Sequence, residues 1–69
     1  MIRFITSSYK TMFELPDGGS IRITRQDGES FERECKRIDD YHTEIGVNVF
    51  HICEFAELCE RNNWTVEPV

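Results

Sequence analysis

Two short stretches, Pro16-Asp17-Gly18 and Gln26-Asp27-Gly28, lie ten residues apart and organise the first half of the chain. In each, the Asp-Gly pair suits a three-residue hairpin loop, in which two right-handed residues precede a glycine in the left-handed region. The first stretch is the stronger signal, because the proline ring pre-sets φ at the first loop position. Both stretches therefore predict tight connections between antiparallel strands.

The two loops together predict a register for a three-stranded meander. Phe13 is expected opposite Ile21, and Ile23 opposite Phe31, with all four side chains on one face of the sheet. Opposite charges facing each other support this register, because such cross-strand pairs are mildly stabilising. The expected charge pairs are Arg22 with Glu32 and Arg25 with Glu29.

The second half of the chain contains a helical pattern. Apolar residues recur at helical spacing, with Phe55 and Leu58 widening the stripe, and Asn48 is the expected N-cap. Asn62-Asn63 is expected to stop the helix in a left-handed turn, and Trp64–Glu67 to return as an edge strand. The stripe consists of Val49, Ile52, Cys53, Ala56 and Cys59.

These patterns predict an α+β fold, with one domain spanning residues 1–69. We expect a small antiparallel β-meander of three to four strands, with one C-terminal amphipathic helix packed on its apolar face. Segment 37–47 has no readable pattern, apart from a break at Gly46. The predicted strands are Ile2–Thr6, Tyr9–Leu15, Ser20–Arg25 and Phe31–Lys36.

Composition narrows the class of protein. The hydrophobic content of 39% is too high for a disordered chain. The longest uncharged stretch, Ile45–Cys53, is far too short to cross a bilayer, and the N-terminus lacks the apolar core of a signal peptide. Three cysteines are an odd number, which favours free, largely buried thiols in a reducing cytoplasm.

The net charge of −5, from thirteen acidic and eight basic residues, argues against binding to a phosphate backbone. A metal site is not expected either, because His42, His51, Cys53 and Cys59 lack the spacing of known ligand sets. A Cys–His catalytic pair needs an exposed thiolate, whereas these cysteines lie on predicted inner faces. We therefore expect no catalytic residue, no cofactor and no enzymatic activity.

Acidic residues follow one another at i+3 on the polar side of the predicted helix, with a histidine one turn before them. This acidic ridge is the candidate partner-binding site, and it consists of His51, Glu54, Glu57 and Glu60. Such rows are usually just a solvated helix face. The functional interpretations are a recognition surface for a basic partner, or carboxylates that imitate phosphates.

Two aromatic–histidine pairs, Tyr41-His42 and Phe50-His51, flank the unread segment, and they are candidates for neighbours in space. The simpler interpretation is that Tyr41 and Phe50 complete the core, while both histidines form hydrogen bonds at its rim.

The chain resembles a group of short proteins of unknown function carried by conjugative and other mobile elements of gut Firmicutes. The resemblance rests on Leu15–Gly19, Ile38–His42 and Phe50–Glu57, and it covers nearly the whole chain. It implies no activity, cofactor or catalytic residue. Similar stretches inside larger element-encoded proteins would suit an interaction module.

The sequence thus predicts a cytoplasmic, non-enzymatic module that binds another protein, in the context of mobile-element maintenance or transfer. Neither a nucleic acid nor a membrane is an expected partner, and an exposed strand edge could join two copies. The alternative is an acidic inhibitor that imitates nucleic acid, of the counter-defence type, and a small enzyme comes third.

Overall fold

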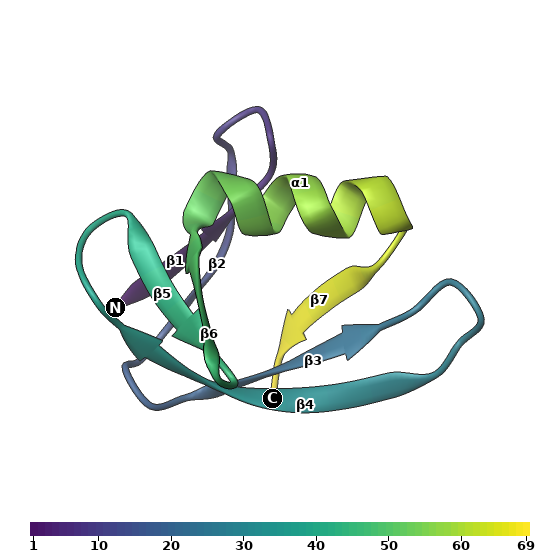
Figure 1. The fold of residues 1–69 in the computed structure, drawn as a ribbon, viewed down its shortest axis with the longest axis horizontal. Coiled ribbons are helices and arrows are strands. Elements are labelled where there is room, and N and C mark those ends of the chain that lie inside the picture. The colour runs from purple at the N-terminus through teal and green to yellow at the C-terminus, as the bar shows by residue number, and fades with distance from the viewer.

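The computed structural model describes residues 1–69 and contains seven strands and one helix (Figure 1). Strands β1 and β2 form a two-stranded antiparallel sheet, and the other five form an antiparallel sheet in the order β6-β5-β4-β3-β7. The elements are β1 (Ile2–Ile5), β2 (Thr11–Leu15), β3 (Ser20–Thr24), β4 (Ser30–Arg37), β5 (His42–Ile45), β6 (Asn48–His51), α1 (Ile52–Asn62) and β7 (Thr65–Pro68).

The predicted α+β class with a single helix is confirmed, whereas the predicted count of three to four strands is wrong. The helix is followed by β7, which pairs with β3 at one edge of the larger sheet. The additional strands β5 and β6 form a hairpin closed at Gly46, which has a φ of +65°. Strand β5 lies in the unread segment 37–47, and β6 lies where the helix was expected to begin. Four-residue strands are too short to show a period of two convincingly.

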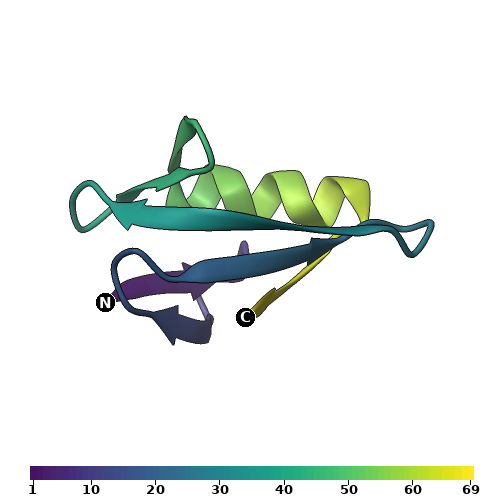
Figure 2. The same ribbon diagram turned by 90° about the horizontal axis from the view of Figure 1, so that it is seen from below.

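The predicted pairing across the first turn is wrong. Phe13 lies opposite Phe4 of β1, and the two rings stack with centroids 4.8 Å apart. Gly18 adopts the expected left-handed conformation, but its N–H donates to the carbonyl of Cys35 in β4 at 2.8 Å. The turn therefore carries the chain from one sheet to the other, and Figure 2 shows the dark-blue arrow of β2 below the β3–β4 hairpin.

The predicted pairing across the second turn is confirmed. Ile23 lies opposite Phe31, and Gly28 adopts a φ of +92°. Both predicted charge pairs form, at 3.1 Å between Arg22 and Glu32 and at 3.9 Å between Arg25 and Glu29.

The helix starts later than predicted. Its N-cap is His51, whose Nδ1 accepts a hydrogen bond from the N–H of Cys53 at 3.1 Å. The predicted N-cap, Asn48, instead begins β6, because residues 48–51 pair with β5. The predicted stop is confirmed, since Asn63 is left-handed and the N–H of Trp64 donates to the carbonyl of Cys59.

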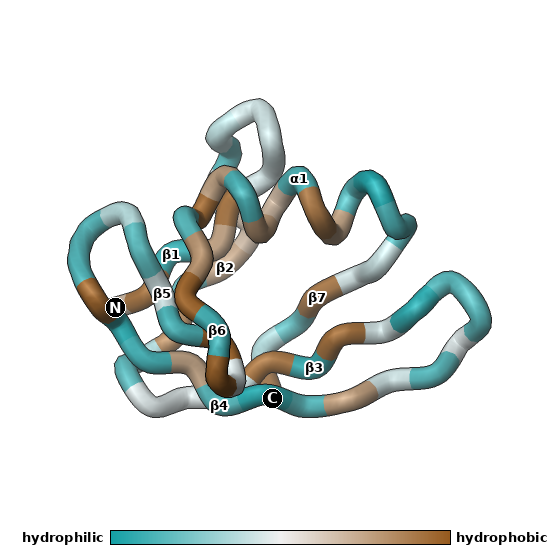
Figure 3. Tube along the Cα trace, viewed as in Figure 1, coloured by the Kyte–Doolittle hydropathy of each residue, from teal (hydrophilic) through white to brown (hydrophobic).

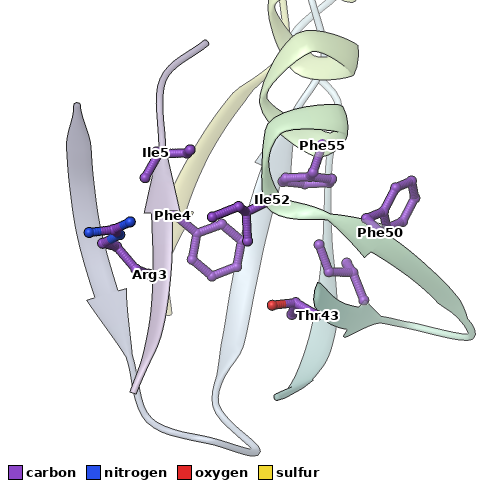
Figure 4. A pocket seen from close by; sticks show the side chains of 8 residues that line it. Arg3, Phe4, Ile5, Thr43, Phe50, Ile52 and Phe55 are labelled. Carbon is purple, nitrogen blue, oxygen red and sulfur yellow. The ribbon is translucent and has the colours of Figure 1, made fainter. Parts of the chain in front are cut away.

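The core lies between the helix and both sheets, because α1 packs against β1, β6 and β7. Figure 3 shows apolar stretches on β3 and β6 and alternating apolar and polar positions along α1. Figure 4 shows the junction between β1, β5 and α1, where Phe4, Thr43 and Ile52 surround a cavity of about 10 Å³. The buried cluster comprises Ile2, Phe4, Leu15, Ile21, Ile23, Cys35, Ile45, Phe55 and Cys59.

A cavity of that size has room for one water molecule at most, so the two sheets are closely packed there. The eleven-residue helix α1 is too short and too polar to cross a membrane, and no other helix is present.

Candidate functional site

The acidic ridge divides into two parts. Glu54 and Glu57 are exposed on α1 and form no ion pair. Glu60 instead accepts hydrogen bonds from the hydroxyl and the backbone N–H of Ser7, both at 2.7 Å. These two bonds lower the pKa of Glu60. Glu60 thus fastens the β1–β2 loop to the helix, which leaves two free carboxylates on the ridge.

His51 has a structural contact of its own. Because its Nδ1 accepts the N–H of Cys53, the neutral ring carries its proton on Nε2. The ring also stacks on Tyr41, with centroids 6.3 Å apart and planes at 8°. His51 therefore starts the helix, and its partner-binding role, like those of Glu54, Glu57 and Glu60, stays a prediction.

The structure brings the two histidines together. His42 and His51 are directly opposite each other on β5 and β6, with ring centroids 5.2 Å apart. His42 Nδ1 lies 2.9 Å from Asp39 Oδ1, and that carboxylate also accepts the backbone N–H groups of Tyr41 and His42. The N–H of Tyr41 and the ring of His42 lower the pKa of Asp39.

The two aromatic–histidine pairs, which were candidates for neighbours, lie close together. Of the simpler interpretation, the hydrogen bonds of both histidines are confirmed, but Tyr41 does not complete the core. Tyr41 is 61% exposed, whereas Phe50 is half-buried, packs against the core and contacts Phe55 edge to face at 5.4 Å. Phe50 and His51 are consecutive in β6, so their side chains lie on opposite faces of the sheet, and His42 of β5 lies on the same face as His51.

The tautomers of the two histidine rings limit which ring nitrogens can bind a metal ion. When both rings are neutral, donation from His42 Nδ1 to Asp39 leaves Nε2 of His42 with its lone pair, whereas Nε2 of His51 carries a hydrogen. A metal ion bound by both Nε2 atoms would require His51 to give up its role as the N-cap. No group of three or more histidine, cysteine, aspartate or glutamate side chains is placed to hold a metal ion.

The cysteines are free thiols, and two of them are buried. Burial raises the pKa of Cys35 and Cys59 to about 11, so very little thiolate is present at neutral pH. Cys53 is half-buried at the first turn of α1. Since the thiolate is the nucleophile, Cys35 and Cys59 behave as small apolar core residues.

An apolar hollow that the sequence did not reveal lies between α1, β4 and β6. Its volume is about 200 Å³. We call it the aromatic groove, after four half-buried side chains that line it: Phe31, Phe50, Leu58 and Trp64.

The aromatic groove continues into the acidic ridge. A neighbouring hollow of about 260 Å³ shares Phe50 and Leu58 with the groove and is bordered by Glu54, Glu57 and Arg61. The free carboxylates of the ridge are therefore one rim of an apolar surface rather than an isolated row of charges.

Cations border the groove on the sheet side. The guanidinium groups of Arg25 and Arg33 lie over the ring of Phe31, at 5.2 and 4.6 Å from its centroid. Trp64 meets the same ring edge to face, with centroids 6.3 Å apart. The alternation of Phe31 and Arg33 is visible in the sequence, but their neighbours come from α1, β6 and the turn before β7. Only the topology reveals that combination.

A second apolar hollow, of about 290 Å³, lies between β2, α1 and β7, and Met12, Trp64 and Val66 are part of its lining. Its polar lining is limited to Glu60 and Thr65, and the carboxylate of Glu60 is already bonded to Ser7. This hollow therefore has few groups to orient a ligand, whereas the aromatic groove has charges of both signs.

Comparison of the chain with protein-family models, curated proteins and solved structures found no match.

Proposed function

We propose that the protein is a non-enzymatic interaction module that binds another protein through the aromatic groove. The observation that carries the proposal is the set of apolar side chains that line this hollow and stay half-buried at the edge of the core: Phe31, Phe50, Leu58 and Trp64. A contiguous apolar surface with a polar rim is typical of a protein-binding site.

The acidic ridge contributes to this proposal through Glu54 and Glu57. Both carboxylates stand beside Leu58 at the rim of the groove, where they can attract and orient a basic partner. His51 and Glu60 act indirectly, since His51 starts the helix and Glu60 fastens the neighbouring loop.

The alternative, an acidic imitation of nucleic acid, has weaker support. It needs a continuous band of carboxylates spaced like phosphates, whereas Glu60 is bonded to Ser7 and Arg61 interrupts the band beside Glu57. The apolar character of the groove also favours a protein partner over a basic, phosphate-binding cleft.

The proposal also covers the cellular compartment and the biological context in which the protein acts. Three unpaired thiols support a reducing cytoplasm, and the resemblance to mobile-element proteins supports a role in the maintenance or transfer of such elements.

The test is a peptide-display selection against the wild-type protein, followed by affinity measurements on two charge-matched variants. Leu58→Asp puts a carboxylate into the aromatic groove, whereas Met12→Asp puts one into the second hollow. We expect selected peptides to bind wild type and Met12→Asp alike and to lose about tenfold or more in affinity for Leu58→Asp. Peptides that bind Leu58→Asp as well as wild type, or a selection without enrichment, would overturn the proposal.

A further inference from the structure

Strand β4 is longer than its neighbour on one side. It pairs with β3 from Ser30 to Glu34, but β5 pairs with it only from Cys35 to Arg37. On the β5 side, the segment 30–34 therefore has no strand beside it. We call this segment the open edge, and the aromatic groove lies next to it, because Phe31 and Arg33 of the same segment line the groove.

The hydrogen bonds at the end of the open edge show which backbone groups are available. The carbonyl of Glu34 accepts from the N–H of Gly46 on the β5 side, while Cys35 bonds in the other direction, to Gly18 and Gly19. Backbone groups alternate in direction along a strand, so the groups of Ser30 and Glu32 point away from β3. These are the groups that an added strand would meet. The carbonyl of Glu32 already accepts a hydrogen bond from Nη1 of Arg33 at 2.7 Å, so an added strand would replace or share that bond.

Side chains along the open edge alternate in the same way. Phe31 and Arg33 face the groove, while Glu32 and Glu34 lie on the opposite face, where Arg22 pairs with Glu32. Glu34 forms no ion pair. An added strand would thus place every second side chain in an apolar groove and the others beside carboxylates.

We propose that the open edge of β4 binds an extended peptide segment in which basic and apolar residues alternate. The inference rests on the proposed function and adds the class of partner. Apolar side chains of the segment enter the groove beside Phe31 and Leu58, and basic side chains lie opposite Glu32 and the free Glu34. Main-chain hydrogen bonds to the open edge supply affinity, as in other cases of strand addition.

Charge distinguishes this occupant from a second copy of the chain. Two open edges paired with each other would bring Glu32 and Glu34 of one copy against the same acidic residues of the other, and like charges directly opposite are destabilising. A basic segment meets the same residues with complementary charge, and the net charge of −5 attracts it over longer distances.

The probe is a capped hexapeptide of alternating lysine and valine, titrated while the fluorescence of the single tryptophan, Trp64, is followed. Because Trp64 lines both the groove and the second hollow, the titration is repeated on Leu58→Asp and Met12→Asp to assign the signal. Two methylated versions form a matched pair. N-methylation of the lysines blocks the N–H groups that face β4, whereas N-methylation of the valines blocks groups that face solvent. We expect the first to weaken binding by about tenfold or more and the second to change it little.

A protein variant tests the same edge from the other side. Glu32→Pro removes an outward N–H and places a ring on the open edge, where proline is tolerated in edge strands, while Glu32→Thr removes the same charge and keeps the N–H. We expect peptide affinity to be much lower for the proline variant than for the threonine variant, with both variants folded by circular dichroism.

Equal binding of the two methylated peptides would overturn strand addition. If Leu58→Asp still weakened that binding, the groove would keep its proposed function while the inference failed. A wild-type protein that sediments as a dimer, and that Glu32→Pro converts to a monomer, would assign the open edge to a second copy and would also overturn the inference.

Discussion

Gly18 and Gly28 have nearly the same backbone conformation, with φ of +86° and +92°, and each follows an aspartate. The turn at Gly28 closes the hairpin between β3 and β4, while the turn at Gly18 leads from one sheet to the other. The local residues thus select a turn conformation without selecting which strands the turn will join.

The anchors of the two turns account for the difference. At the second turn they are local, since Arg25 and Glu29 bond across the loop and Asp27 Oδ1 accepts from the N–H of Glu29. At the first turn, Asp17 Oδ1 accepts the N–H of Arg37, twenty residues away. Long-range contacts with β4 therefore decide the path of the chain after Gly18.

The largest loss of stability is expected from a substitution at Gly19. The second turn has no equivalent glycine, because Glu29 follows Gly28. A Cβ at this position would lie 2.9 Å from Cγ of the buried Leu15 and 3.0 Å from the carbonyl oxygen of Pro16. Gly19→Val should lower the free energy of unfolding by about 3 kcal/mol, the upper end for overpacking. Urea unfolding measures this loss, and a loss no larger than that of Gly28→Ala would show that the first turn can adjust.

Alanine at Gly18 and at Gly28 should have equal, intermediate effects. Neither glycine has any atom within 4 Å of the position that a Cβ would occupy, so the cost is that of the left-handed conformation alone. That cost is about 1–2 kcal/mol per residue. Unequal losses of unfolding free energy for Gly18→Ala and Gly28→Ala would show that the two turns are not equivalent in their local energetics.

The aspartates should differ, since only one of them has a distant partner. Asp17→Ala leaves the N–H of Arg37 without its acceptor and should cost about 1 kcal/mol. Asp27→Ala removes the bond to the N–H of Glu29, but that bond lies within one exposed loop that Arg25 and Glu29 also close, so the loss should stay within about 0.5 kcal/mol. Hydrogen exchange at the amide of Arg37 provides the specific readout: it should accelerate for Asp17→Ala and remain unchanged for Asp27→Ala.

The smallest effect on stability is expected at a third aspartate, Asp39. Its carboxylate accepts only local bonds within the turn between β4 and β5. Its folded pKa is lowered, so its contribution is fully present above the unfolded pKa and is lost as the pH falls through the folded pKa. Amide shifts of Tyr41 and His42 should follow this titration in NMR spectra. Asp39→Asn keeps an acceptor oxygen without the titration, and identical shifts in that variant would assign them to another group.

The parts of the fold that could be predicted are those fixed by nearby residues. The β3–β4 register follows from one turn and two charge pairs, all within Arg22–Glu32. The pairing of Phe13 could not be read from its turn, because the stacked partner, Phe4, lies in a strand before it. His51 replaces Asn48 as the N-cap for a similar reason, since pairing with β5 keeps residues 48–51 extended.

The candidate site was harder to predict than the fold. The sequence indicated that Glu54 and Glu57 would be exposed on the helix, and both are. It gave no indication of the groove beside them, because Phe31, Phe50 and Trp64 come from separate segments whose approach depends on the order of the strands.

Strand β3 pairs with β4, which is close to it in the sequence, and with β7, which is far from it. This difference has a consequence for folding during synthesis on the ribosome. Arg22 meets Glu32 across ten residues of chain but Glu67 across 45. Closing the longer loop costs about 1.3 kcal/mol more in chain entropy. The β3–β4 hairpin can form as soon as it emerges, while the other edge of β3 waits for β7. A nascent chain that has emerged only as far as α1 already contains β5, which can pair with β4, but the outer edge of β3 stays unpaired until β7 follows, and the chain is most prone to aggregation during that interval.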